Sequence, residues 1–233
     1  FSDGTTQDVT ALSSWSIKDT TGSGVAGINS RGLATAKSIG KARITARYLT
    51  TSATATLEVT AAALRSLTLS PSNPAAAKGT TQRFTATGTF SDGTVQDVTA
   101  SADWAVMDLT GSGVASIDGT GTALAESVGQ ARVSAEYLGQ VVQTTLTVTP
   151  AAVVSLAITP LAPAIAKGTT QQFVATAHLT DGSDQDVSAS AAWTAADVAG
   201  SGVAAVDASG LAKGNAVGSA SISCAYQGFT ATT

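Results

Sequence analysis

Aspartates that recur along the chain are the residues whose type and spacing could do chemistry. The densest group is Asp181, Asp184 and Asp186. Hard cations such as Ca²⁺ prefer clustered carboxylate oxygens, so these three residues are weak calcium candidates, although no metal site is the expectation. The ligand order of an EF-hand is not met, because Gly182 directly follows Asp181 and no glutamate stands at the bidentate position. The alternative is that each aspartate serves a turn or a solvated strand.

Nucleophilic or zinc-dependent catalysis is not predicted, because the chain has one histidine and one cysteine. His178 lies on an alternating segment, at a position expected to face solvent. Cys224 has no basic neighbour to lower its thiol pKa, so we expect it to be a small buried hydrophobic residue. A catalytic triad or a zinc ligand set would need further partners. We therefore expect no enzyme activity and, calcium aside, no cofactor.

Composition excludes two classes of partner. The net charge is −4, and the 12 basic residues are scattered singly along the chain. Nucleic-acid binding needs clustered Lys and Arg, so no nucleic-acid partner is expected. No apolar run approaches the roughly 20 residues that span a bilayer, so no membrane span is expected in this segment.

The elements that must position these residues repeat at a fixed interval of 89 residues. Phe1-Ser-Asp-Gly returns at Phe90 and, as Leu-Thr-Asp-Gly, at Leu179. A period this long is the size of a small domain with its own core. We predict an incomplete repeat at 1–61 that lacks its first two strands, a complete repeat at 62–150, and a repeat at 151–233 that lacks its last strand. These are called the first, second and third repeats below.

Short β-rich runs separated by turn signals predict about seven strands in the second repeat. Residues 82–90 and 131–137 alternate apolar and small or polar side chains, as half-buried strands do. The Asp-Gly pair at 92–93 predicts a hairpin with a type I′ turn. No segment shows the 3.6-residue apolar period of an amphipathic helix. The predicted fold class is all-β, with tandem antiparallel β-sandwiches arranged end to end.

One tryptophan per repeat is the expected centre of each core. Aromatic residues make up only 5% of the chain, and the tryptophans keep the 89-residue spacing. Even spacing favours a packing anchor, and the alternative is a platform on which a sugar stacks. The predicted structural core is Trp15, Trp104, Trp193, Phe84, Phe173, Tyr137 and Tyr226.

Several short motifs together resemble the bacterial immunoglobulin-like domain, group 2. They are Leu67-Thr-Leu-Ser-Pro71, Lys78-Gly-Thr-Thr-Gln82 and the run from Trp15 through Gly32-Leu-Ala34 to Gly40-Lys-Ala-Arg-Ile44. The third repeat carries the first two again at Leu156 and Lys167. Thr122 departs from the pattern, because leucine stands at the equivalent position of the other repeats.

The resemblance implies a role without chemistry. Such domains occur in tandem in bacterial surface proteins, including adhesins and intimin-like or invasin-like proteins. The chain is therefore expected to be a non-catalytic stalk or fibre segment of a bacterial cell-surface or secreted protein, which spaces or displays a functional part outside the cell. The alternatives are an adhesive module for a host protein or glycan, and a phage tail or capsid appendage.

The segments between repeats are short and lack the Gly/Ser composition of flexible linkers. About four residues separate the last strand of the second repeat from the first strand of the third. Neighbouring repeats of the same chain are therefore the expected partners. The incomplete first and third repeats are expected to be completed either by further chain or by strands from another copy in a fibre.

Overall fold

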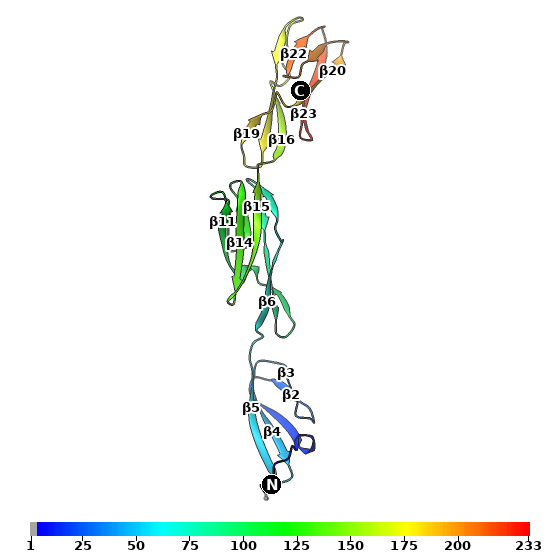
Figure 1. Ribbon diagram of the computed structural model, residues 1–233. Coiled ribbons are helices and arrows are strands. Elements are labelled where there is room, and N and C mark those ends of the chain that lie inside the picture. The colour runs from blue at the N-terminus through cyan, green and yellow to red at the C-terminus, as the bar shows by residue number, and fades with distance from the viewer. Residues whose placement is uncertain (1–3) are drawn as a thin grey trace. The chain divides into compact units, whose positions relative to one another are not determined.

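The protein is built from short β-strands (Figure 1). The computed structural model describes residues 4–233, whose helical segments are two 3₁₀ turns, η1 (Thr10–Leu12) and η2 (Thr99–Ser101). The chain divides into two compact units, Phe1–Leu64 with Phe90–Gly93, and Arg65–Thr89 with Thr94–Thr233. The sheets are antiparallel apart from one short parallel pair. The predicted all-β fold class is confirmed.

The first repeat has two small sheets. One has the order β1-β4-β5 and the other is the pair β2-β3. The strands are β1 (Ser14–Thr21), β2 (Ala26–Ile28), β3 (Ala34–Ala36), β4 (Gly40–Tyr48) and β5 (Thr51–Val59).

The second repeat has three sheets, with the orders β10-β9-β6, β11-β14-β15-β7 and β12-β13-β8. Its strands are β6 (Leu64–Ser70), β7 (Ala75–Ala77), β8 (Thr81–Arg83), β9 (Thr85–Phe90), β10 (Val95–Asp97), β11 (Asp103–Thr110), β12 (Ala115–Ile117), β13 (Thr122–Ala125), β14 (Gly129–Tyr137) and β15 (Gln140–Thr149). Strands of three or four residues, such as β7 and β8, carry too little alternation to be recognised in the sequence. With these short strands included, the second repeat has more strands than the seven or so predicted.

The third repeat has the sheet orders β16-β18-β19, β17-β22-β21 and β20-β23-β24. Its strands are β16 (Val153–Thr159), β17 (Thr170–Gln172), β18 (Val174–Leu179), β19 (Asp184–Asp186), β20 (Ala192–Ala199), β21 (Ala204–Val206), β22 (Leu211–Gly214), β23 (Ser219–Tyr226) and β24 (Phe229–Thr232).

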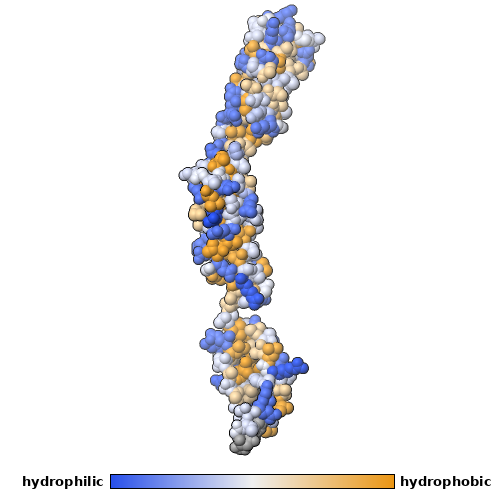
Figure 2. Space-filling view, in the orientation of Figure 1, coloured by the Kyte–Doolittle hydropathy of each residue, from blue (hydrophilic) through white to orange (hydrophobic). Residues whose placement is uncertain are grey.

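The second and third repeats each have a hydrophobic core of their own. Phe84 and Leu146 lie at the centre of one core, and both side chains are fully buried. Phe173 and Ile222 lie in the other. Strand alternation produces these cores, because successive side chains of a strand point to opposite faces. On the visible surface, polar and apolar residues are interspersed (Figure 2).

The tryptophans lie at the margins of the cores, which differs from the central position expected. Trp104 is half-buried and packs against the core around Phe84. Its indole N–H donates a hydrogen bond to the Thr99 carbonyl oxygen at 2.9 Å, which a position in the apolar centre could not provide. Gly121 covers the ring, since a Cβ there would lie 2.8 Å from Trp104 Cζ2. Equivalent indole hydrogen bonds join Trp15 to Thr10 and Trp193 to Ser188.

Three further sequence-based details are settled by the structure. Tyr137 and Tyr226 are half-buried near the ends of β14 and β23. Thr122 is half-buried at a position where the equivalent Leu211 is 38% exposed, so its departure from the family pattern does not fall in the centre of the core. The turn before β10 is not type I′. Gly93 has φ +84° and Asp92 does not have a positive φ. The Gly93 amide donates to the Phe90 carbonyl, so Ser91 and Asp92, not Asp92 and Gly93, are the central residues of this four-residue turn.

Candidate functional site

His178 and Cys224, the residues considered for catalysis, lie on different strands. His178 on β18 faces Asp184 on β19, and its Nδ1 lies 2.5 Å from the Asp184 carboxylate. Cys224 on β23 is 1% exposed, and burial raises the pKa of its thiol. The buried Cys224 thiol is therefore poorly suited to act as a nucleophile.

The three aspartates proposed for calcium do not converge. Asp184 contacts His178, and the Asp186 carboxylate accepts hydrogen bonds from Ser188 that lower its pKa. Asp181 turns the other way, toward Lys78. Among residues 4–233, no group of three or more acidic, histidine or cysteine side chains is arranged to hold a metal ion. The Asp181, Asp184 and Asp186 carboxylates each have their own partner, and calcium binding by them stays a prediction.

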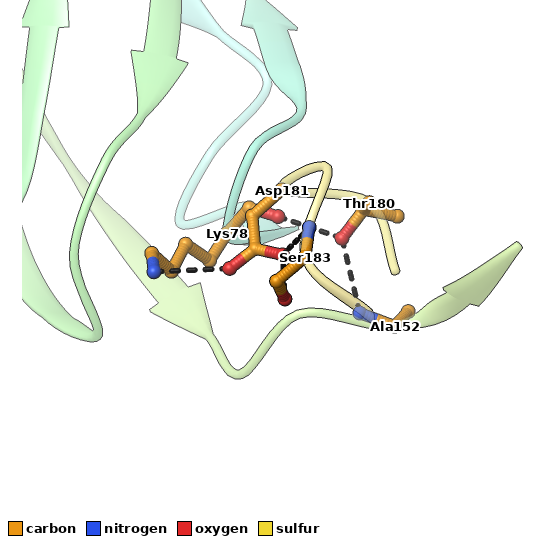
Figure 3. A network of polar contacts seen from close by, with 5 residues as sticks. All are labelled: Lys78, Ala152, Thr180, Asp181 and Ser183. Carbon is orange, nitrogen blue, oxygen red and sulfur yellow. Dashed lines mark hydrogen bonds and ion pairs between the residues drawn. The ribbon is translucent and has the colours of Figure 1, made fainter. Parts of the chain in front are cut away.

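A polar network that joins two repeats lies where the second and third repeats meet. The turn between β18 and β19 reaches the corner between β7 and β8 (Figure 3). We call this contact the joint, and its residues are Lys78, Gly79, Ala152 and Thr180–Ser183. Only residues 150–152 separate β15 from β16 at this point.

The turn is shaped by its own side chains before it meets the other repeat. The Leu179 carbonyl accepts from the Gly182 amide at 3.0 Å, and Gly182 takes φ +78°. The Asp181 carboxylate accepts from the Ser183 amide at 3.1 Å and from its hydroxyl at 2.6 Å. An aspartate that accepts from the residue two positions later is a common turn device. The turn is therefore preorganised.

Two interactions cross between the repeats. The Thr180 hydroxyl donates to the Lys78 carbonyl at 2.6 Å while it accepts from the Ala152 amide at 3.0 Å. Lys78 Nζ lies 3.0 Å from the second oxygen of Asp181, whose side chain is 14% exposed (Figure 3). The Thr180 hydroxyl thus links the turn both to residue Ala152 between the strands and to the second repeat. The Lys78–Asp181 ion pair is a second contact between the repeats.

The corner of the second repeat is held by its own backbone. The Lys78 amide donates to the Thr149 carbonyl at 2.9 Å, and the Gly79 amide donates to the Ala125 carbonyl at 2.8 Å. Gly79 has φ +86°, and a Cβ there would overlap the backbone of Thr180 and Asp181. Glycine is required on both counts, because it permits the left-handed conformation and the close approach.

Hydrogen bonds and charge stabilise the ionised form of Asp181. The Ser183 hydroxyl contributes most and the Lys78 side chain contributes next. Together with the Ser183 amide they lower the pKa of Asp181 from 3.8 to about 2. The carboxylate therefore stays charged through the whole neutral and mildly acidic range.

The joint is expected to weaken only in strong acid. Because the folded pKa of Asp181 lies below its ordinary value, its contribution to stability is complete above about pH 4 and is lost as the pH falls toward 2. Carboxyl ¹³C shifts of Asp181 followed by NMR measure this titration. Ser183→Ala should raise the pKa of Asp181 more than Lys78→Met. A midpoint near 4 in the unaltered chain would contradict the described contacts.

Sequence reasoning missed the joint although a signal was present. Lys-Gly-Thr-Thr-Gln stands at both Lys78 and Lys167, and Asp-Gly stands at Asp92 and Asp181. Taken alone, the Asp-Gly pair predicts only a local hairpin, and the Lys-Gly motif indicates only the family resemblance. That the two motifs contact one another depends on how consecutive repeats meet, which no single motif encodes.

The antiparallel sheets, the separate cores and the half-buried tryptophan define an immunoglobulin-like β-sandwich protein. Residues 152–230 match the bacterial Ig-like domain, group 2. They belong to this family, and the resemblance indicated by the sequence motifs is confirmed.

One curated relative carries a functional name. Over 237 residues the chain is 40% identical to "Ice-binding protein 1" of Shewanella frigidimarina (strain NCIMB 400). The match covers 100% of this chain and 26% of that protein, so the chain spans about a quarter of the relative's length.

Two solved structures show a partial likeness to this chain. Domains 1–6 of the surface-layer protein SbsC show 15% identity and a TM-score of 0.36 over 98% of this chain and 32% of that one. Drosophila OTK, extracellular domains 3–5, shows 10% identity and a TM-score of 0.37 over 90% and 76%. Neither likeness bears on function. Among residues 4–233, no helix has the length and apolar character needed to cross a bilayer.

Proposed function

We propose that this chain is a non-catalytic structural segment of a bacterial cell-surface or secreted protein, and that it holds another part of that protein away from the cell. The observation that carries the proposal is the joint. A spacer must resist bending where its units meet, and the Lys78–Asp181 pair and the Thr180 hydroxyl act at that point. Membership of this family supports an extracellular location of the chain, because such repeats are typical of surface proteins.

The relative's name supports the same arrangement. A protein named for ice binding contains a segment 40% identical to this chain, which accounts for about a quarter of its length. We infer that in a protein of this kind the Ig-like repeats act as the spacer and that a separate part makes the functional contact.

The spacer role predicts a single, narrow distribution of distances across the joint. Spin labels at exposed positions, Gln143 on β15 and Thr194 on β20, place one probe in each repeat. Cys224 is first replaced by alanine, the residue found at its equivalent positions 46 and 135. Double electron–electron resonance should give one narrow peak that keeps its width at high salt, because the Thr180 hydroxyl bond and the close backbone contact are not ionic. A broad distribution in the unaltered joint would contradict the proposal.

A second candidate, an adhesive module, is favoured by one face of the third repeat. The outer face of β20-β23-β24 carries no charged side chain along Ala192, Thr194, Ala196, Ser219, Ser221, Ser223, Ala225, Thr230 and Thr232. Equivalent positions in the other repeats hold Lys18, Arg43, Asp103, Arg132 and Glu136. A face without charges is less strongly hydrated, which favours contact with an uncharged surface.

The two candidates are separated by binding measurements on the isolated chain. The spacer proposal predicts no retention on ice or on a glycan array. The adhesive candidate predicts retention that is lost in Ser221→Arg, which restores the arginine found at positions 43 and 132. Thr20→Arg, on the outer face of another repeat, is the control.

A further inference from the structure

The first repeat carries a row of basic side chains on the outer face of the sheet β1-β4-β5. The row consists of Lys18 on β1 and Lys41, Arg43 and Arg47 on β4, and all four are exposed. Strand alternation places the three residues of β4 on one side, and the six-residue interval from the first to the last spans about 20 Å. The fold thus gathers basic residues that stand apart in the sequence.

The negative charge of this face balances only one of these cations. Lys41 Nζ lies 3.2 Å from the carboxylate of Glu58, its cross-strand partner on β5. Among residues 4–233, Lys18, Arg43 and Arg47 take part in no ion pair. We call these three residues the cationic row. It leaves an excess of positive charge on the outer face.

Two members of the cationic row directly oppose each other. Lys18 and Arg43 are cross-strand partners in the antiparallel pair β1-β4. Like charges at directly opposite positions destabilise a sheet. The equivalent pair in the third repeat is Ala196 and Ser221, and the pair in the second repeat contains only one charge. The fold therefore does not require this unfavourable pair, and a partner of opposite charge would relieve it.

The net charge of the first repeat is opposite in sign to that of the other two. Residues 1–61 carry six basic and four acidic side chains, a net charge of +2. Residues 62–150 carry four and seven, and residues 151–233 carry two and five, so each has a net charge of −3. An anionic surface therefore attracts the first repeat and repels the other two over distances of about 8 Å at physiological salt.

The same face is also open to solvent in the second repeat, whose sheet has an additional strand, β7. Met107 of β11 is 53% exposed there and Val141 of β15 is 56% exposed. They lie on the outer face, opposite Arg132 and Glu136 of β14. An additional strand at the edge of the sheet thus leaves this face uncovered.

The chemistry of the face suits a broad anionic surface better than one bound anion. The side chains of the cationic row are long and exposed, and Arg47 Nε makes only a 3.4 Å contact with the Leu49 carbonyl, so no rigid cradle surrounds a single site. The strands also present no aromatic ring on this side on which a sugar or a base could stack. Apart from Glu58, the other outer positions carry hydroxyl groups and are Ser14, Ser16, Thr45, Ser52, Thr54 and Thr56.

We propose that the outer face of β1-β4-β5 docks onto an anionic lipid surface, whose phosphate headgroups neutralise the cationic row. Headgroups supply negative charge over an area, and each basic side chain near such a surface strengthens binding about fivefold. Because the face has no apolar or aromatic side chain to insert into lipid, binding is electrostatic and peripheral. The proposal does not depend on the spacer role.

The test measures co-sedimentation of the 1–233 chain with lipid vesicles. Vesicles of equal parts phosphatidylglycerol and phosphatidylcholine are anionic, and vesicles of phosphatidylcholine alone are neutral. The chain should bind the anionic vesicles at low salt and not the neutral ones. Binding should be lost near 1 M salt, where the screening length falls to about 3 Å. Equal binding to neutral vesicles, or binding that persists in high salt, overturns the proposal.

Three substitutions remove the cationic row without disturbing the sheet. Lys18→Ala, Arg43→Ser and Arg47→Ala introduce the residues found at the equivalent positions of the third repeat. Each should lower the partition coefficient about fivefold, and all three together about a hundredfold. Arg43→Ser should not lower the melting temperature, because it removes a like-charge pair. A triple variant that binds as tightly as the unaltered chain contradicts the proposal.

Arg31→Ala is the matched control, because it removes the same charge from the other side of the sheet. Arg31 precedes Gly32, which lies against the inward-facing ring of Trp15. Its loss should change the partition coefficient less than about twofold, since salt screens a charge held away from the lipid. If Arg31→Ala weakened binding as much as Arg43→Ser, net charge rather than this face would be responsible. The proposal also fails if the chain binds immobilised heparin, an acidic polysaccharide, but not the anionic vesicles.

Discussion

Phe84→Ala is expected to lower the melting temperature of the second repeat by at least about 12 °C. The side chain is fully buried in the core that also holds Leu146 and Val148. Truncating a buried phenylalanine to alanine costs about 3–5 kcal/mol, and each kcal/mol shifts the melting temperature of a domain this small by about 4–8 °C. That cost is a large share of the 5–15 kcal/mol by which typical domains are stable. Calorimetry measures the change.

Phe229→Ala is the matched control, because the same side chain is removed from a position that is 36% exposed. Its effect should be several-fold smaller. Trp104→Ala should fall between the two, since its ring is half-buried and its N–H bonds Thr99. An effect of Trp104→Ala larger than that of Phe84→Ala would show that the tryptophan, not the phenylalanine, is the centre of the core.

Gly79→Val should separate the second and third repeats. A Cβ at this position overlaps the backbone of Thr180 and Asp181, so no side-chain adjustment can relieve it. The turn must withdraw, and the Lys78–Asp181 ion pair and the Thr180 hydroxyl bond are lost with it. The distance distribution across the joint should change from one narrow peak to a broad one.

Gly168→Val is the control that distinguishes loss of the joint from backbone strain. Gly168 is the equivalent glycine of the third repeat and has nearly the same conformation, φ +90° against +86°. A Cβ there meets no atom within 4 Å. Both variants therefore incur a left-handed valine, about 1–3 kcal/mol, and only Gly79→Val also disrupts the joint. If the two variants gave the same distance distribution, the contact at Gly79 would not hold the repeats together.

The strands and the cores were predictable because their information is local. Alternation along residues 82–90 places Phe84, Ala86 and Phe90 on one face, and all three are buried. The same alternation holds in β14, where Ala131, Val133 and Ala135 are fully buried. Any chain with this pattern must turn its apolar face to a partner sheet, so the fold class follows.

The details that depend on other parts of the chain were not predictable. The position of Trp104 depends on a backbone carbonyl that accepts from its N–H, and on the close approach of Gly121. The acidic group at 181–186 looked like a cation site because sequence spacing does not show which way each carboxylate points. In the structure, Asp181 faces another repeat and Asp184 faces a neighbouring strand. The position of Trp104 and the directions of these carboxylates are both determined by tertiary contacts.

The joint also bears on how such a chain changes over generations. The second and third repeats each carry both halves of the contact, a Lys-Gly corner and an Asp-Gly turn. A gene duplication that copies one 89-residue unit therefore adds a repeat whose turn meets an existing corner, without any new complementary mutation. Recombination between such gene segments can then change the number of repeats while each added Asp-Gly turn still matches a Lys-Gly corner.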